Sequence, residues 1–273
     1  FLSTENTMLV KSKRTVNFLA CCLWVLRHLG NSAQRMDNYL YLIINLTAIS
    51  LPFACSFEHR VRYFKKFLSL APGFLSTIVF FIVWDIFFTK WGIWGFNKNY
   101  LMGLEFFALP LEEYLFFLCI PYSSLFIHFC KEKLTPKLKF SNLTTKFFVI
   151  GLTSFLLIIS ILNFNKFYTF SAFILAVISI NLSFFRAPQL LNSFLVSYIF
   201  ILIPFFIVNG LLTGSFIIDE IVWYNNNHNL GLRIGTIPFE DIFYGFSMLF
   251  LPLYINHELN HNMSDWNDKI MDY

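Results

Sequence analysis

The sequence predicts an all-α integral membrane protein with about seven transmembrane helices, arranged as a parallel 3+1+3 duplication. The 273 residues are 57% hydrophobic and 13% charged, and the mean hydropathy is +0.62. Soluble domains carry about 25% charged residues. Apolar stretches of about 20 residues, long enough to cross a bilayer core, recur along the chain. An acidic motif in the third stretch returns in the last one, and this repetition indicates the duplication.

Seven apolar stretches are predicted to cross the membrane. They cover residues 39–57, 70–89, 104–129, 147–162, 167–185, 190–213 and 232–256. Lysine and arginine are concentrated in the loops after the first and third stretches, whereas the loop 214–231 has neither. Because cytoplasmic loops are enriched in these residues, the first and third loops are predicted to face the cytoplasm. The first span then begins outside, and the carboxyl end lies inside.

Four segments are expected along the chain. Residues 1–35 carry a short apolar run without a cleavage site, and Met36 stands directly before the first strong apolar stretch. We therefore expect residues 1–35 to be an upstream extension that does not belong to the native protein. Residues 36–146 would form the first repeat, residues 147–258 a linking span and the second repeat, and residues 259–273 a polar tail.

The repeated motif places two adjacent acids after a proline. Glu112 and Glu113 follow Pro110, Glu240 and Asp241 follow Pro238, and a glycine precedes each proline by seven positions. A carboxylate at mid-bilayer depth costs roughly 2.5 to 3.5 kcal/mol on insertion scales, so paired acids there indicate a functional site. Since the motif occurs twice, we expect a two-fold site at the interface between the repeats.

Weaker matches extend the repeat beyond the motif. Residues 44–47 (Ile-Asn-Leu-Thr) resemble residues 180–183 (Ile-Asn-Leu-Ser), and Asp85 near the end of the second span aligns with Asn209. Spans one to three then correspond to spans five to seven in the same direction, and the fourth span is the extra helix. Chance similarity between apolar helices is the alternative explanation.

The acids allow a structural and a catalytic interpretation. Proline kinks a helix or begins a new helical segment, and acids in a first turn are stabilised by the helix dipole. Burial among aromatic residues instead favours a protonated carboxyl group, which a general acid requires. Adjacent helical residues point about 100° apart, so one acid of each pair would face a common cavity and the other would orient it.

Further residues are candidates for the site. Asp85 is either a third catalytic carboxylate or a group hydrogen-bonded to Asn45, while Glu105 and Arg233 either pair between the repeats or anchor helix ends. An acid beside an aromatic ring can deliver a proton and then stabilise a carbocation. The expected substrate-binding residues beside the acids are Trp84, Pro110, Phe116, Phe117, Pro238, Phe243 and Tyr244.

Several classes of function lack their motifs. The sequence has no P-loop, no GxGxxG after a strand, no HExxH and no aspartate-rich metal motif, so we expect neither a cofactor nor a metal ion. The five cysteines are odd in number and lack CxxC spacing, which argues against a disulfide framework. The net charge of +4 comes from loop residues that set membrane orientation, so nucleic acid is not an expected partner.

The motifs resemble those of a known family. LPLEEYLFF at 109–117, WD at 84–85, WGF at 94–96 and IPFEDIFYGF at 237–246 resemble the membrane-integral, flavin-free lycopene cyclases in their fused, single-chain form, over about Met36 to Glu258. The resemblance implies a bacterial cytoplasmic membrane enzyme of carotenoid biosynthesis, with lycopene or another acyclic carotenoid and the lipid bilayer as its partners. Such an isomerase (intramolecular lyase) converts the ψ ends of lycopene to β rings, giving γ-carotene and β-carotene without net redox change.

The family's acidic motif maps onto Glu112, Glu113, Glu240 and Asp241, with Asp85 as the further candidate. An ε-cyclase or a hydratase on the same scaffold would differ in what quenches the cation. A retinal protein would need a lysine in the last span, and residues 232–256 contain none. A proton-coupled transporter also fits intramembrane acids.

Overall fold

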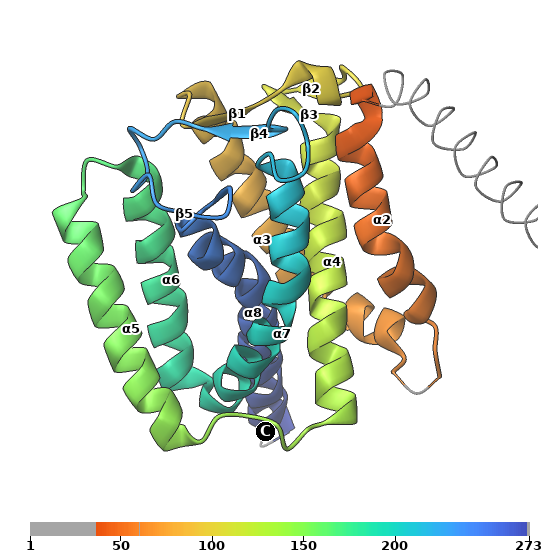
Figure 1. The fold of residues 1–273 in the computed structure, drawn as a ribbon. Helices are drawn as coiled ribbons and strands as arrows, with labels where there is room; N and C mark the ends of the chain where they lie inside the picture. Colours follow the sequence, from red (N-terminus) through yellow and green to blue (C-terminus); the bar gives the residue numbers. More distant parts are fainter. Residues whose placement is uncertain (1–36, 60, 272–273) are drawn as a thin grey trace, which may run out of the picture.

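The structure is a computed structural model that describes residues 37–59 and 61–271. Within these residues, seven α-helices run between two ends of the molecule, and short strands cover one end (Figure 1). The helices are α2 (Leu40–Cys55), α3 (Tyr63–Lys90), α4 (Leu111–Leu134), α5 (Asn142–Leu162), α6 (Phe167–Arg186), α7 (Pro188–Leu212) and α8 (Glu240–Met271). The predicted upstream extension, residues 1–35, lies outside the described residues.

Six of the described helices, α2 to α7, are long and apolar enough to cross a membrane. Helix α8 is less apolar because it begins with Glu240 and Asp241, but it has the length to span. Buried residues such as Phe250 and Leu253 place α8 in the interior, where it packs against α3 and α6. The predicted all-α integral membrane fold with about seven helices is confirmed.

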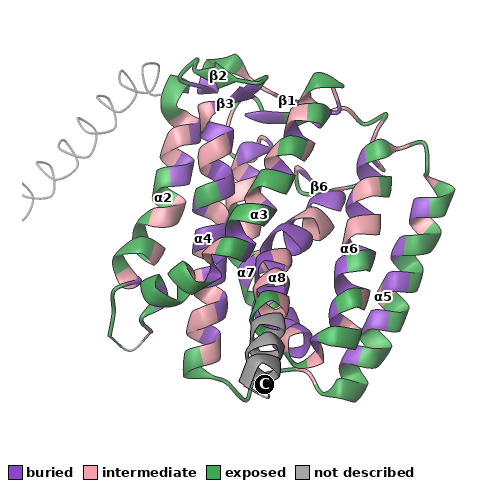
Figure 2. Cartoon of the chain, turned by 180° about the vertical axis from the view of Figure 1, so that it is seen from behind, coloured by how far each residue is buried: buried purple, intermediate pink, exposed green. Residues whose placement is uncertain are grey.

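The outer faces of the helices are apolar. Figure 2 shows exposed residues along the outer helices α2 and α5, while buried residues gather on α4, α7 and α8. Leu51 on α2, Ile161 on α5 and Phe185 on α6 are all more than 60% exposed. Apolar side chains on such faces are stable in contact with lipid, so these surfaces fit the hydrocarbon core of a bilayer.

The predicted spans 104–129 and 232–256 begin several residues before the helices α4 and α8 do. Residues 104–110 and 232–239 form hairpins, which pair β2 (Glu105–Phe106) with β3 (Leu109–Pro110) and β5 (Arg233–Ile234) with β6 (Ile237–Pro238). Short apolar runs do not distinguish strand from helix by hydropathy, and proline, which lacks an N–H, suits the position before a helix. Pro110 is therefore the N-cap of α4, and neither it nor Pro238 lies inside a span.

Other boundaries differ by a turn or more. Helix α3 begins seven residues before the predicted 70, and α5 begins five residues before 147. The segment 259–273, predicted to be a polar tail, continues α8 as far as Met271. The prediction followed apolar stretches and therefore left out the polar and basic first turns of these helices. The helices continue through those turns into the interface between membrane and water.

The strands at the covered end reveal the two-fold arrangement. Strand β1 (Trp94–Phe96) pairs antiparallel with β4 (Val222–Tyr224), and Gly95 faces Trp223 at the centre. On either side, Asn97 N donates to Ile221 O at 2.8 Å and Asn225 N donates to Ile93 O at 2.9 Å. Each bond repeats the other with the two halves exchanged, so a pseudo-two-fold axis passes through the centre of this pair.

The middle helices interlock the two repeats. Helix α3 of the first repeat packs against α8 of the second, and α7 of the second packs against α4 of the first, while α5 stands outside both triplets. Gly73 of α3 allows the close approach to α8, because a Cβ added there would lie 2.4 Å from the Pro252 carbonyl oxygen. The interior is therefore built from helices of both repeats.

Substituting Gly73 tests this contact. We expect Gly73→Ala to lower stability by about 1 to 3 kcal/mol, because the new methyl group meets backbone that cannot move aside. The matched control is Gly151→Ala on α5, where an added Cβ meets nothing within 4 Å. Thermal unfolding of the purified proteins in detergent compares the two. Equal stability of Gly73→Ala and the parent would contradict the close α3–α8 packing.

The orientation of the molecule is also testable. Phe107 and Phe216 are 76% and 98% exposed in the two loop regions at the strand-covered end, and Leu138 is 46% exposed beyond the other end of α4. In a cysteine-free background, we expect Phe107→Cys and Phe216→Cys to react with an impermeant maleimide from outside the cell and Leu138→Cys only after lysis. Reaction of the first two only from the cytoplasm would reverse the predicted orientation.

Candidate active site

A small cavity lies under the strands, where the two repeats meet. Its volume is about 60 Å³, and its polar lining includes Asp85 of α3, Glu113 of α4, Asn209 of α7 and Asp241 of α8. Aromatic side chains form much of the remaining wall. They are Tyr41, Trp94, Phe96, Phe116, Tyr168, Phe205, Tyr224 and Tyr244. Three carboxyl groups from both repeats therefore face one space.

Glu113 and Asp85 form the acidic group of the first repeat. The Tyr41 hydroxyl donates to Glu113 Oε2 at 2.5 Å. Asp85 Oδ1 accepts a hydrogen bond from Trp94 Nε1 and a longer one, 3.3 Å, from Thr89 Oγ1. The Asp85 and Glu113 carboxyl groups lie within hydrogen-bonding reach of each other, and Asp85 Oδ2 receives no N–H or O–H from any described residue. Two carboxyl groups this close to each other disfavour ionisation of both at once.

Asp85 does not contact Asn45, so that interpretation is wrong. The Asn45 side chain instead donates to the Glu112 backbone carbonyl at 2.8 Å and fastens α2 to the first turn of α4. The Trp94 indole that reaches Asp85 lies on β1, outside the predicted spans. Hydropathy patterns describe spans and carry no information about loop residues folded back over them.

Asp241 is the carboxyl group of the second repeat in the cavity. Tyr168 donates to Oδ1 at 2.5 Å, and Tyr224 donates to Oδ2 at 3.1 Å. Burial raises the pKa of Tyr224 well above its ordinary value, and the neighbouring Asp241 raises that pKa further. The Tyr224 phenol therefore keeps its proton and remains a donor. Each carboxyl oxygen of Asp241 therefore has a phenolic donor.

The other acid of each pair points away from the cavity. Glu112 Oε1 accepts the Met102 N–H at 2.6 Å, and Glu240 Oε1 accepts the Leu230 N–H at 2.7 Å. Thr169 also donates to Glu240, at 2.6 Å. Of each pair only the second acid faces the common space, in agreement with the 100° spacing. The first acid accepts hydrogen bonds from the preceding loop, and no hydrogen bond joins it to the second acid, which it was expected to orient.

The tyrosines correct the alignment of the first spans. Tyr41 of α2 and Tyr168 of α6 each donate to the second acid of their repeat, 72 and 73 residues further along the chain. They are structural equivalents, so the match between residues 44–47 and 180–183 is out of register. Asn181 bonds the Val177 carbonyl of its own helix and has no part in the site. The nearly equal separation of tyrosine and acid, 72 and 73 residues, was the sequence feature that could have identified both tyrosines.

Glu105 and Arg233 do not pair between the repeats. They occupy equivalent positions in strands β2 and β5, and neither anchors a helix end. Glu105 lies 3.5 Å from Lys98 in an exposed pair. Arg233 lies over the Tyr224 ring, 5.4 Å from its centroid, and donates to the Thr236 carbonyl. Arg233 thus supports a tyrosine that bonds Asp241.

The expected substrate-binding residues do not all lie at the acidic cavity. Phe116 and Tyr244 line the acidic cavity. Trp84 packs on Tyr244 at 5.7 Å between ring centroids, and Phe117 lies in the core beside Phe116. Phe243 lines a different cavity, between α5, α6, α7 and α8, and packs on Phe173. Pro110 and Pro238 end their hairpins and do not line the acidic cavity.

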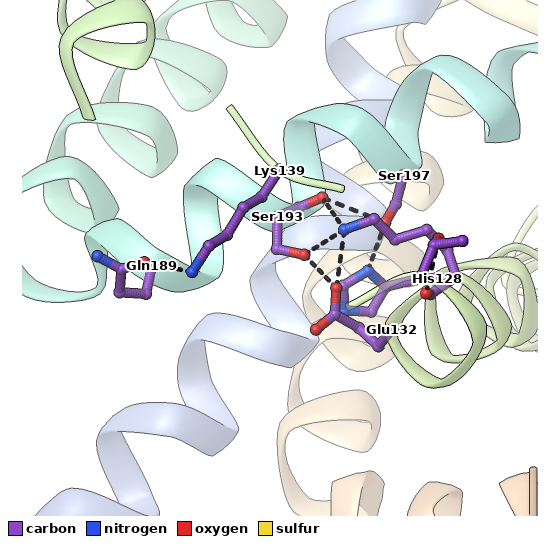
Figure 3. A network of polar contacts seen from close by, with 8 residues as sticks. His128, Glu132, Lys139, Gln189, Ser193 and Ser197 are labelled. Atoms are coloured by element: carbon purple, nitrogen blue, oxygen red, sulfur yellow. Dashed lines mark hydrogen bonds and ion pairs between the residues drawn. The ribbon is translucent and has the colours of Figure 1, made fainter. Parts of the chain in front are cut away.

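A second buried polar cluster joins α4 to α7 near their other ends (Figure 3). Lys131 Nζ contacts Glu132 at 2.9 Å and donates to Ser193 Oγ at 2.5 Å, while His128 Nδ1 and Ser197 Oγ lie 2.8 Å apart. Each charged or polar group here has a partner from the opposite helix or a neighbouring residue, which lowers the cost of burying it. These residues do not line the acidic cavity, and they hold the two helices together.

Helices with lipid-compatible faces that enclose a buried group of carboxyl and aromatic side chains define an integral membrane protein with an acidic cavity between its two repeats. A model of the lycopene cyclase family matches residues 38–131 and 165–259, which is more than half of the chain. The chain therefore belongs to the lycopene cyclase family. Searches of curated proteins and of solved structures find no match.

The two matched segments coincide with the two structural repeats. The first begins just before Tyr41 and the second just before Tyr168, and helix α5 falls between them. Each segment contains three helices, a strand of the β1–β4 pair and one hairpin. The family unit is thus half of this fold, present twice, and membership implies a carotenoid substrate within the membrane.

Proposed function

We propose that this protein is a lycopene β-cyclase, an isomerase that closes the acyclic ψ ends of lycopene into β rings. The observation that carries the proposal is the position of Asp85, Glu113 and Asp241 around one aromatic-walled cavity. Family membership supports cyclisation of a carotenoid. The acids and rings are the groups that an acid–base reaction through a carbocation requires.

The reaction needs one proton donor and one proton acceptor. A proton added to C2 of the terminal C1=C2 bond leaves a tertiary cation at C1. The C5=C6 bond then attacks C1, a C1–C6 bond forms, and the positive charge moves to C5. Loss of the proton from C6 restores the C5=C6 bond within a β ring. One proton enters and one leaves, so neither an oxidant nor a reductant is consumed.

The contacts favour distinct roles for the carboxyl groups. The Asp85–Glu113 pair, in contact and buried, suits the proton donor, because two adjacent carboxyl groups retain a shared proton. Asp241, whose two oxygens each accept a phenolic hydrogen bond, suits the proton acceptor, because such bonds favour the ionised form over the protonated one. Asn209, which aligns with Asp85 in the second repeat, cannot donate a carboxyl proton. We therefore assign one catalytic centre to the whole chain.

The aromatic wall supports ring closure over the alternatives. Tyr244, Trp94 and Phe116 line the same cavity as the acids, and aromatic rings can stabilise a nearby cation. Most of the lining of this cavity is aromatic or aliphatic and offers few partners to a bound water molecule, which disfavours capture of the cation by hydration. Proton loss from C6 gives a β ring, and loss from C4 would give an ε ring.

Conservative substitution of each acid tests the proposal. We expect Glu113→Gln and Asp241→Asn each to lower cyclisation by roughly 100-fold or more, the scale of general acid–base catalysis. The matched controls are Glu112→Gln and Glu240→Gln, whose amide oxygens still accept the loop N–H bonds, so cyclisation should persist. Pigments from lycopene-producing bacterial cells, separated by chromatography and compared at equal membrane abundance, give the measurement.

The products also distinguish the alternatives. β-ionone rings support the β-cyclase, ε rings or hydroxylated ends would identify the related enzymes, and unchanged lycopene with inserted protein would reject cyclisation. Full activity of both Glu113→Gln and Asp241→Asn would remove the acids from the mechanism. If only Glu112→Gln and Glu240→Gln lost activity, the first acid of each pair, and not the second, would carry out the proton transfer.

A further inference from the structure

A larger cavity adjoins the acidic one. Its volume is about 330 Å³, and it lies between α2, α4 and α7. Four residues line both cavities, namely Ile120, Ser124, Phe205 and Asn209. Thr47 and Leu51, on the lipid-facing side of α2, line the larger cavity and are exposed. The larger cavity therefore lies between the acid site and the lipid-facing side of α2.

The lining of this larger cavity suits an apolar chain. Leu51, Phe126, Ile127 and Val208 contribute apolar side chains. The Ser123 hydroxyl donates to the Ala48 carbonyl of α2 and to the Cys119 carbonyl of its own helix, so it does not require a polar guest. No charged side chain lines the larger cavity among the described residues. A hydrocarbon dissolved in the bilayer could enter it without desolvating a charge.

The pseudo-equivalent position on the other side of the molecule is filled. Given the alignment of Asp85 with Asn209, Trp84 and Phe81 of α3 correspond to Val208 and Phe205 of α7. The rings of Trp84 and Phe81 stack and pack edge-on against Tyr244, with centroids 5.7 and 4.9 Å from it. Valine in place of tryptophan leaves space on the α7 side. The two repeats are nearly symmetric, but in the part of the chain that the structure describes the cavity is present only on the α7 side.

We propose that the acyclic isoprenoid chain of the substrate occupies the cavity between α2, α4 and α7, with its reacting end at the carboxyl groups. This inference rests on the proposed cyclisation. It assigns recognition of the substrate chain to Ala48, Leu51 and Val208, which do not line the acidic cavity. A carotenoid that lies in this cavity presents one end at a time. Closing both ends therefore requires release of the one-ring product and binding in the reverse direction.

Filling the opening tests the proposal. Val208→Trp reproduces on α7 the side chain that closes the α3 side, and we expect it to lower cyclisation by roughly tenfold or more, by excluding the chain from its site. The matched control is Leu152→Trp, which fills the third cavity, of about 280 Å³, between α5 and the second repeat. Cyclisation should persist in this control. Pigment analysis at equal membrane abundance gives the comparison.

A second measurement does not depend on folding of a variant. Leu51→Cys, in an active background without other cysteines, is labelled in isolated membranes with a bulky apolar maleimide after the protein has folded. We expect the label to block cyclisation of added lycopene, whereas the same label on Ile158→Cys, which is 57% exposed on α5, should not. Inactivity of the unsubstituted protein would refute cyclisation itself. Active parent protein, together with full activity of Val208→Trp and of labelled Leu51→Cys, would overturn the chain-binding site alone.

Discussion

The structure depends on one constraint, which is that carboxyl groups buried in a membrane protein need donors from the protein itself. Glu113 and Asp241 receive phenolic hydrogen bonds from Tyr41 and Tyr168, and Asp85 receives one from the Trp94 indole. These donors come from the first helix of each repeat and from a strand that folds over the helix ends. Each unsatisfied group would cost several kcal/mol in hydrocarbon. The covering strands, the loop anchors and the helix starts together keep these donors in place.

The fold was largely predictable, whereas the partners of the acids were not. Hydropathy and the repeated proline–acid motif were sufficient to predict the membrane helices, the duplication and the two acid pairs. The hairpins that end at Pro110 and Pro238 were missed because hydropathy does not distinguish a short apolar strand from the start of an apolar helix. Tyr41 and Tyr168 were missed because their role depends on packing between helices far apart in sequence. The sequence alone does not show which of Glu112 and Glu113 faces the cavity, because this depends on the direction in which each side chain leaves the helix.

The duplication makes the fold nearly two-fold symmetric, and residue differences between the two repeats make the site asymmetric. The two repeats share the tyrosine–acid bond and the loop anchors at Glu112 and Glu240. They differ where Asp85 corresponds to Asn209 in the cavity. One repeat therefore contributes an adjacent acid pair, and the other contributes a carboxylate between two phenols. Because α3 and α7 each pack on the last helix of the other repeat, both halves are needed to enclose the cavity.

The central claim is that both repeats build one site that holds one carotenoid. The most direct measurement is the stoichiometry of binding to purified Glu113→Gln protein, which should bind lycopene without converting it. Titration in detergent, followed by the absorbance of bound carotenoid per chain, should saturate at one displaceable carotenoid per chain. Saturation at two per chain would show that each repeat has a site of its own and would contradict the shared cavity.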